Sequence, residues 1–80
     1  MMSKVVAIGS INTDFVVRTR RFPVPGETIA GESFDIFGGG KGANQAIAAA
    51  RLGAAVTFFG AAGEDANSDQ RVADLEREGI

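Results

Sequence analysis

The sequence predicts an α/β fold in which helices pack on parallel strands, and three segments support this prediction. Two short runs of β-branched and aromatic residues, 5–8 and 55–59, each end at a glycine, as strands buried on both faces of a parallel sheet do. The segment 43–52 lies between them, is rich in alanine and is the strongest predicted helix, with Gly53 as its stop. A strand, a helix and a second strand form the crossover that joins parallel strands.

The segment between the first strand and this helix has a different character. Residues 15–18 and 27–37 flank a stretch, 20–26, in which two prolines and a glycine prevent regular pairing. Apolar and polar residues alternate only weakly in 27–37, so neither face is apolar throughout. We therefore expect two or more exposed antiparallel strands that form a flap, with the short basic cluster at 18–21 in its solvated turn.

A second helix is expected at about 68–78. Its signals are a capping-box pair, an apolar stripe and a glycine stop, at Asn67 and Gln70, Val72 and Leu75, and Gly79. The apolar residue Ile80 follows the stop and would begin a further strand. We therefore expect the chain to be the N-terminal fragment of a larger fold.

Composition excludes several classes of function. Hydrophobic residues make up 45% of the chain and charged residues 22%, which is typical of a packed domain, and a net charge of −2 gives no footprint for nucleic acid. The chain has no cysteine and no histidine, which excludes disulfides and nucleophiles of those types. No apolar run approaches the roughly 20 residues of a transmembrane helix, and no signal-peptide pattern opens the chain. We therefore expect a cytoplasmic protein that binds neither nucleic acid nor membrane.

The glycine-rich stretch 38–45 is the strongest signal of a ligand site. Glycines allow backbone N–H groups to approach a ligand, and the helix that follows directs its positive end to the same place. Asn12 and Asp14 follow the carboxyl end of the first strand, where ligands bind in open α/β sheets. Together with Lys41 and Asn44 they suit a polyhydroxylated ligand, whose hydroxyls both donate and accept hydrogen bonds. The structural alternative for the first two is a turn held by their own side chains.

Two nucleotide-binding interpretations compete for the same glycines. The pattern Gly38-x-Gly40-x-x-Ala43 fits the dinucleotide fingerprint, with Glu64 and Asp65 roughly 20 residues further on. That fingerprint normally occupies the first turn between strand and helix, whereas here a strand and a flap come first. A Walker A loop is excluded because Gly42, not Ser or Thr, follows Lys41. A sugar site is favoured, and the dinucleotide site remains an alternative.

The motifs of the chain resemble the N-terminal part of the ribokinases in the PfkB carbohydrate kinase family, over all 80 residues. The resemblance is carried by Gly-Ser-Ile-Asn-x-Asp at 9–14, Pro-Gly-Glu-Thr at 25–28 and Gly-Gly-Lys-Gly-Ala-Asn-Gln at 39–45, and it continues to Gly63. The sequence departs from the family before the last predicted helix, where the usual Asp-x-Phe-Gly is Asp65-Ala66-Asn67-Ser68. An aromatic residue and a glycine that would pack this helix are therefore missing.

The resemblance implies a ribokinase-like fold with a small β lid, at about 14–19 and 27–37, that covers the sugar and pairs with a second subunit as a homodimer. The implied activity is ATP-dependent phosphorylation of D-ribose to D-ribose 5-phosphate, with Mg²⁺ and K⁺ in the complete enzyme. The implied substrate-binding residues are Asn12, Thr13, Asp14, Gly40, Lys41, Gly42, Ala43 and Asn44.

The family places its catalytic base, nucleotide pocket and cation sites further along the chain, so the resemblance puts none of them within 1–80. We therefore expect residues 1–80 to be inactive alone and to self-associate through uncovered strands and apolar surface. A non-catalytic association module derived from a sugar kinase is the alternative from another class. The sequence leaves the choice between ribose and deoxyribose open.

Overall fold

The computed structural model describes residues 3–80, which form an α/β structure, as predicted. The elements in chain order are β1 (Lys4–Ile8), β2 (Asn12–Arg18), β3 (Ser33–Gly39), α1 (Lys41–Arg51), β4 (Ala55–Phe59) and α2 (Ala66–Arg77). The strands β1 and β4 pair in parallel, and β2 and β3 form an antiparallel hairpin inserted between β1 and α1. The two predicted parallel strands and both predicted helices are confirmed.

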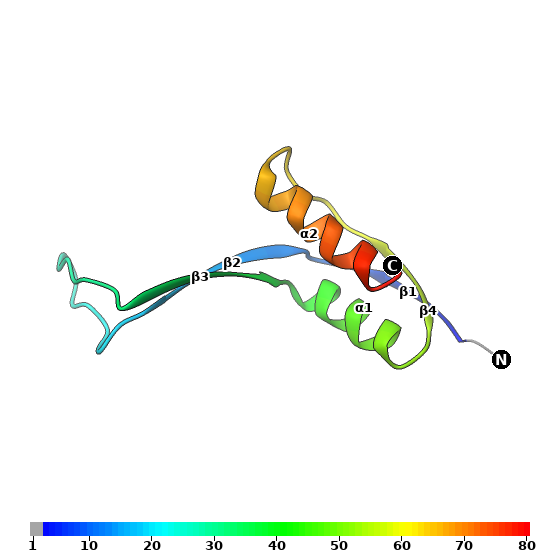
Figure 1. The fold of residues 1–80 in the computed structure, drawn as a ribbon, viewed down its shortest axis with the longest axis horizontal. Coiled ribbons are helices and arrows are strands. Elements are labelled where there is room, and N and C mark those ends of the chain that lie inside the picture. Colours follow the sequence, from blue (N-terminus) through cyan, green and yellow to red (C-terminus); the bar gives the residue numbers. More distant parts are fainter. Residues whose placement is uncertain (1–2) are drawn as a thin grey trace.

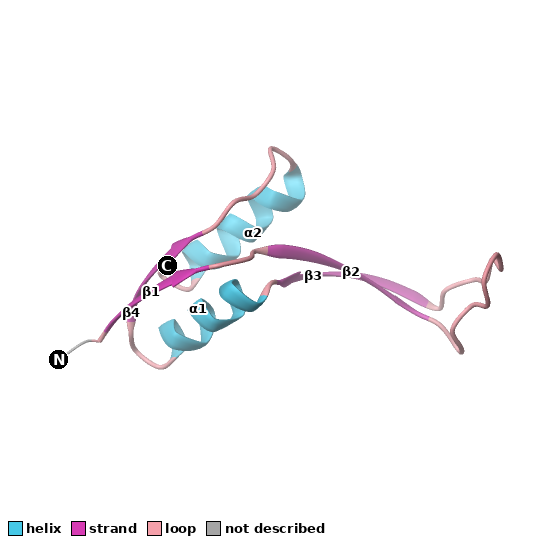
Figure 2. Ribbon diagram, turned by 180° about the vertical axis from the view of Figure 1, so that it is seen from behind, coloured by secondary structure: helices cyan, strands magenta, loops and turns pink. Residues whose placement is uncertain are grey.

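The structure consists of two regions, which we call the base (β1, α1, β4 and α2) and the hairpin (residues 12–39). The hairpin extends far beyond the helices (Figure 1), which gives overall dimensions of 55 × 26 × 19 Å. The radius of gyration is accordingly 16.2 Å, against about 12 Å for a compact domain of this length. The two helices lie beside the base, and α2 also contacts β2 at the root of the hairpin (Figure 2).

The parallel sheet of the base is covered on one face. Val5 lies opposite Val56 and Ala7 opposite Phe58 in the register, and these four residues are half-buried. The alternate positions are exposed, with exposed fractions of 62% for Val6 and 80% for Ile8. The prediction that these strands are buried on both faces is therefore wrong for residues 3–80, because α1 packs against one face of the pair.

The helix α1 supplies most of the core through its alanines, as expected. Ala43 and Ala46 are buried against the base, because a small side chain lets the helix approach the sheet closely. The helix begins at Lys41, two residues before the predicted start at 43, and it ends before the predicted stop at Gly53.

The helix α2 differs from its prediction at both its start and its buried face. Its N-cap is Asp65, whose carboxylate accepts a hydrogen bond of 2.7 Å from the Ser68 N–H, so the capping box at Asn67 was wrong. This bond lowers the pKa of Asp65. The buried residues of the helix are Leu75 and the arginine one turn earlier, Arg71, whereas Val72 is exposed. Neither helix is long and apolar enough to span a membrane.

The second strand of the hairpin is shorter than predicted and begins at residue 33, not 27. Regular pairing ends at Arg18 opposite Ser33, and residues 19–32 form an irregular loop. Glu27 does not pair as a strand residue, because its carboxylate accepts hydrogen bonds from Arg21 and from the Val24 N–H. Arg20 and Arg21 of the basic cluster lie in the solvated turn, as expected, whereas Arg18 is the last residue of β2.

The register of the hairpin produces one apolar face, which the sequence did not reveal. Four side chains share that face, namely Phe15, Val17, Phe34 and Ile36. The ring centroids of Phe15 and Phe34 are 5.9 Å apart, and all four side chains are roughly half exposed. Asn12, Asp14 and Asp35 lie on the opposite face, together with Val16 and Phe37. The expectation of exposed strands with no face that forms a core is confirmed, and the pairing of two strands adds an exposed apolar cluster on one side.

Candidate functional site

The glycine-rich turn and the end of β1 meet at the root of the hairpin. Asn12, the first residue of β2, is the cross-strand partner of Gly39, the last residue of β3. The Ala43 N–H in the first turn of α1 donates a hydrogen bond of 3.0 Å to the Ser10 carbonyl. The structure therefore brings together two motifs that are separated by about thirty residues of hairpin, as the sugar-site interpretation requires.

Asn12 and Asp14 are strand residues and not turn residues. Both lie within β2 on the same face, because one residue separates them in a strand. The structural alternative of a side-chain-stabilised turn is therefore wrong, and both side chains are exposed. Pairing of β2 with β3, which the local sequence did not specify, holds them at the root of the hairpin.

Gly40 forms the tight connection from β3 into α1. It has a φ of +98°, and a side chain here would bring its Cβ within 2.5 Å of the Ser10 carbonyl oxygen. Gly40 is also the N-cap of α1, and no side chain in the described structure caps this end of the helix. The N–H groups of Lys41 and Gly42 can therefore serve a ligand, at the positive end of the helix dipole.

The Asp14 carboxylate lies against the backbone of the glycine-rich turn. A Cβ added to Gly39 would be 2.5 Å from Asp14 Oδ2, so only a residue without a side chain fits beside this carboxylate. The acceptor thus lies beside Gly39, two residues before Lys41, where α1 begins without a side-chain cap. This combination of a charged acceptor with free donors is what a hydroxyl-rich ligand needs.

The remaining predicted site residues divide into side chains and backbone. Lys41 and Asn44 are exposed, whereas Ala43 is 4% exposed and contributes packing. Residues 12–14 border a polar cavity of about 470 Å³ between β2 and the start of α2. Asn44 borders a separate cavity of about 60 Å³ between α1 and α2. The predicted residues therefore surround the root of the hairpin and do not line one enclosed pocket.

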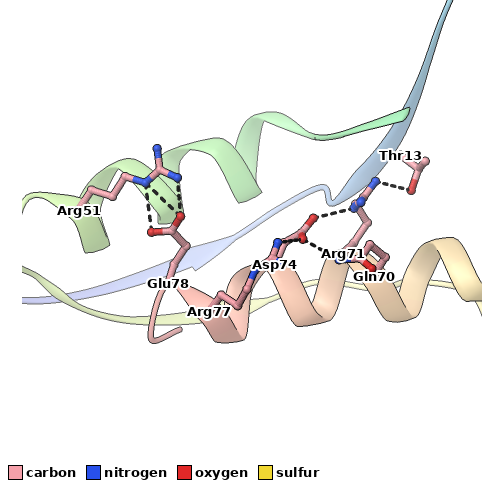
Figure 3. A network of polar contacts seen from close by, with 7 residues as sticks. All are labelled: Thr13, Arg51, Gln70, Arg71, Asp74, Arg77 and Glu78. Carbon is pink, nitrogen blue, oxygen red and sulfur yellow. Dashed lines mark hydrogen bonds and ion pairs between the residues drawn. The ribbon is translucent and has the colours of Figure 1, made fainter. Parts of the chain in front are cut away.

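Thr13 differs from its two neighbours, because its side chain lies on the other face of β2. Its hydroxyl is 3.4 Å from Arg71 Nη1, and Arg71 Nε donates to Asp74 Oδ2 at 3.0 Å (Figure 3). The contact between Arg71 and the hairpin was missed by the sequence analysis. The sequence does contain a signal for this contact. Arg71 lies four residues before Leu75, which places it on the buried face of α2.

Residues 3–80 contain no group of three or more acidic, histidine or cysteine side chains placed to hold a metal ion.

Comparison with known proteins identifies the family. The sequence model of the pfkB family carbohydrate kinases matches residues 2–80. Ribokinase from Haemophilus influenzae is 45% identical over 80 residues, which cover 100% of this chain and 26% of that protein. The structure of ribokinase from Giardia lamblia superposes with a TM-score of 0.87 at 41% identity, over 100% of this chain and 24% of that chain.

A third relative was solved with bound ligands. Arabidopsis thaliana ribokinase complexed with ribose and ATP has a TM-score of 0.79 and 40% identity, and the match covers 94% of this chain and 24% of that chain. The chain belongs to the pfkB family of carbohydrate kinases, and the three relatives named above are ribokinases. It spans about a quarter of their length. The family resemblance is confirmed, and membership of this family argues against the dinucleotide-binding alternative.

Proposed function

We propose that this chain is the N-terminal sugar-binding and lid portion of a ribokinase, which transfers a phosphoryl group from ATP to the 5-hydroxyl of D-ribose. The observation that carries this proposal is the Asp14 carboxylate beside Gly39, at the uncapped start of α1. A carboxylate acceptor beside the glycine-rich turn and N–H donors in the first turn of α1 suit a ligand that is rich in hydroxyl groups. The hairpin is the lid that covers the sugar.

The residues of this chain bind and orient the sugar. Asp14 accepts hydrogen bonds from sugar hydroxyls, and the side-chain amides of Asn12 and Asn44 can both donate and accept. The N–H groups of Lys41 and Gly42 complete the contacts, while Gly40 and Ala43 shape the turn that exposes them. Orientation matters because phosphoryl transfer depends mainly on positioning and on stabilisation of charge.

The other parts of the reaction belong to regions of the family's enzymes that this chain does not include. ATP supplies the phosphoryl group, and Mg²⁺ and K⁺ accompany it in the complete enzyme. We assign no residue of 3–80 to these groups. As an ATP-dependent kinase of sugar metabolism, the complete protein would act in the cytoplasm.

The apolar face of the hairpin supports the proposal of a homodimer. Phe15 is 60% exposed and Phe34 is 58% exposed, although their rings pack against each other. An apolar face on a two-stranded ribbon needs a partner, because it exposes both apolar surface and strand edges to water. We propose that the hairpin of a second copy covers this face, while the opposite face, with Asp14, covers the sugar.

A chimera tests the proposed function. Residues 1–80 replace the matching segment of the Haemophilus influenzae ribokinase, which is 45% identical. We expect this chimera to phosphorylate D-ribose. Asp14→Asn keeps the size of the side chain but removes its charge, so the dissociation constant for ribose should rise about 10- to 100-fold while the KM for ATP stays within about twofold.

Asp35→Asn is the matched control. It makes the same chemical change on the same face of the hairpin, where Asp35 pairs with Val16, further from the glycine-rich turn. We expect ribose binding to be unchanged. If Asp14→Asn leaves ribose binding intact but raises the KM for ATP, the turn is a nucleotide site. A folded, dimeric chimera without kinase activity would favour the association module, and titration with 2-deoxyribose decides between the two sugars.

A further inference from the structure

Arg71 is a buried arginine that joins α2 to the root of the hairpin. Its side chain is 9% exposed, and its guanidinium contacts Asp74 on its own helix and Thr13 on β2. A buried charge is costly unless it is paired and hydrogen-bonded. Both conditions are met here, and one of the two partners belongs to the hairpin.

The Arg71–Asp74 pair contacts both strands of the hairpin at the same position. Thr13 and Gly38 are cross-strand partners. A Cβ added to Gly38 would lie 3.3 Å from Asp74 Oδ2 and 3.4 Å from Arg71 Nε, so the ion pair rests directly on β3 as well as on β2. The absence of a side chain at Gly38 is what allows this close approach.

Asp74 is itself held from two other sides. Its second oxygen, Oδ1, accepts a hydrogen bond of 3.0 Å from Gln70 and contacts the guanidinium of Arg77 (Figure 3). These hydrogen bonds and the two arginines lower the pKa of Asp74, which keeps the carboxylate charged. Asp74 therefore has partners besides Arg71, and its carboxylate remains held on the helix by Gln70 when Arg77 is absent.

We propose that Arg71 is a positioning residue for the sugar: by holding Thr13 through its hydroxyl and Gly38 through van der Waals contact, it fixes the root of the hairpin and aligns Asn12 and Asp14. This inference rests on the proposed function. Asn12 and Asp14 flank Thr13 on the opposite face of β2, so a rotation of the strand at Thr13 would displace both. A displacement of about 1 Å at a reacting group can reduce the rate by about 100-fold.

Arg71→Leu in the chimera tests this proposal. Leucine fits beside Leu75 and Ile47, which border the same small cavity, but it removes one of the two arginines that pair with Asp74. We therefore expect the melting temperature to fall by a few degrees, while Gln70 and Arg77 still hold the carboxylate and the protein stays folded. The KM for ribose should rise about three- to tenfold, and the KM for ATP should not change. A structural role alone would lower the melting temperature and leave the KM for ribose intact, which would overturn the proposal.

Arg77→Leu is the matched control. It removes the same charge from the same helix and from the same Asp74 carboxylate, but Arg77 is 70% exposed and contacts the helix and not the hairpin. We expect no change in the KM for ribose. An effect equal to that of Arg71→Leu would mean that the charge of α2 matters in general and would also overturn the proposal.

Thr13→Val removes the same contact from the hairpin side, because valine lacks the hydroxyl that accepts from Arg71. It therefore tests the proposal even if Arg71→Leu does not fold. It should raise the KM for ribose in the same range, and Thr13→Ser, which keeps the hydroxyl, should restore most of the loss. Thr13→Val and Arg71→Leu remove the same contact, between the Thr13 hydroxyl and the Arg71 guanidinium. The KM for ribose of the double variant Thr13→Val/Arg71→Leu should therefore be no higher than that of the weaker-binding single variant. Additive effects would contradict this.

The two proposals fail in different ways. If Asp14→Asn weakens ribose binding but Arg71→Leu and Thr13→Val do not, the positioning role is wrong and the sugar site stands. If Asp14→Asn leaves ribose binding unchanged, the proposed function is wrong.

Discussion

The base and the hairpin differ in how they bury their side chains. The base buries small and apolar side chains, Ala43, Ala46 and Leu75, between its helices and one face of its sheet. Within the hairpin, residues 12–39, only Gly39 is buried, at the very root. Its strands are joined by cross-strand pairs, and all its large side chains stay accessible. The base therefore holds its shape by packing, and the hairpin keeps both faces free for partners.

This difference bears on the proposed function. As the proposed lid, the hairpin must offer polar groups on one face and must not collapse onto the base. The hairpin meets the base at its root, through the Ser10–Ala43 hydrogen bond and the contact of Arg71 with Thr13. A small number of contacts at the root thus controls the direction of a long element.

The largest effect is expected for a charge on the apolar face of the hairpin. Phe15→Asp in the chimera would bury an unpaired carboxylate in the proposed dimer interface, which costs several kcal/mol, so the dimer dissociation constant should rise about 1,000-fold or more. Sedimentation velocity should then show a monomer at micromolar concentration. Val16→Asp, on the opposite face of the hairpin, is the control and should stay dimeric, and a dimeric Phe15→Asp would exclude the face that carries Phe15 as the interface.

An intermediate effect is expected in the core of the base. Leu75→Ala should destabilise the chimera by about 2–4 kcal/mol, because Leu75 is 7% exposed and its removal leaves a cavity. Phe34→Ala removes a larger side chain from the hairpin but should cost less than about 1 kcal/mol in the monomeric Phe15→Asp background, since it is 58% exposed. Urea unfolding measures both. Equal losses would show that the hairpin is packed as tightly as the base.

The smallest effect concerns pH. The folded-state pKa of Asp74 lies below its ordinary value of 3.8. Between these two pKa values, Asp74 therefore binds fewer protons in the folded protein than in the unfolded chain. Its contribution is complete above pH about 5 and is lost as the pH falls through the folded pKa. The melting temperature of wild type minus that of Asp74→Asn should therefore be positive at pH 7 and should decrease as the pH falls towards 2.

The control for the pH prediction is Glu76→Gln, an exposed carboxylate on the same helix. The melting temperature of Glu76→Gln should differ little from that of wild type at pH 7 and at pH 2. A difference for Asp74→Asn that persists undiminished at pH 2 would mean that the effect comes from shape and not from charge.

Helices, strands and motifs that depend on neighbouring residues could be predicted from the amino-acid sequence alone. The alanine-rich run made α1, the apolar runs ended by glycine made β1 and β4, and the motifs at 9–14 and 39–45 indicated the family and the sugar residues. These patterns are local, since helix propensity, strand patterning and turn chemistry act over a few residues.

Contacts between residues that are far apart in the sequence could be seen only in the tertiary structure. The apolar face of the hairpin exists because the register of β2 with β3 places Phe15 opposite Ile36. The contact of Arg71 with Thr13 joins residues 58 positions apart, and no periodicity of α2 could indicate which side chain would meet its arginine. Register and helix placement result from the packing of the whole chain, so residues that look ordinary in the sequence acquire their roles only in the fold.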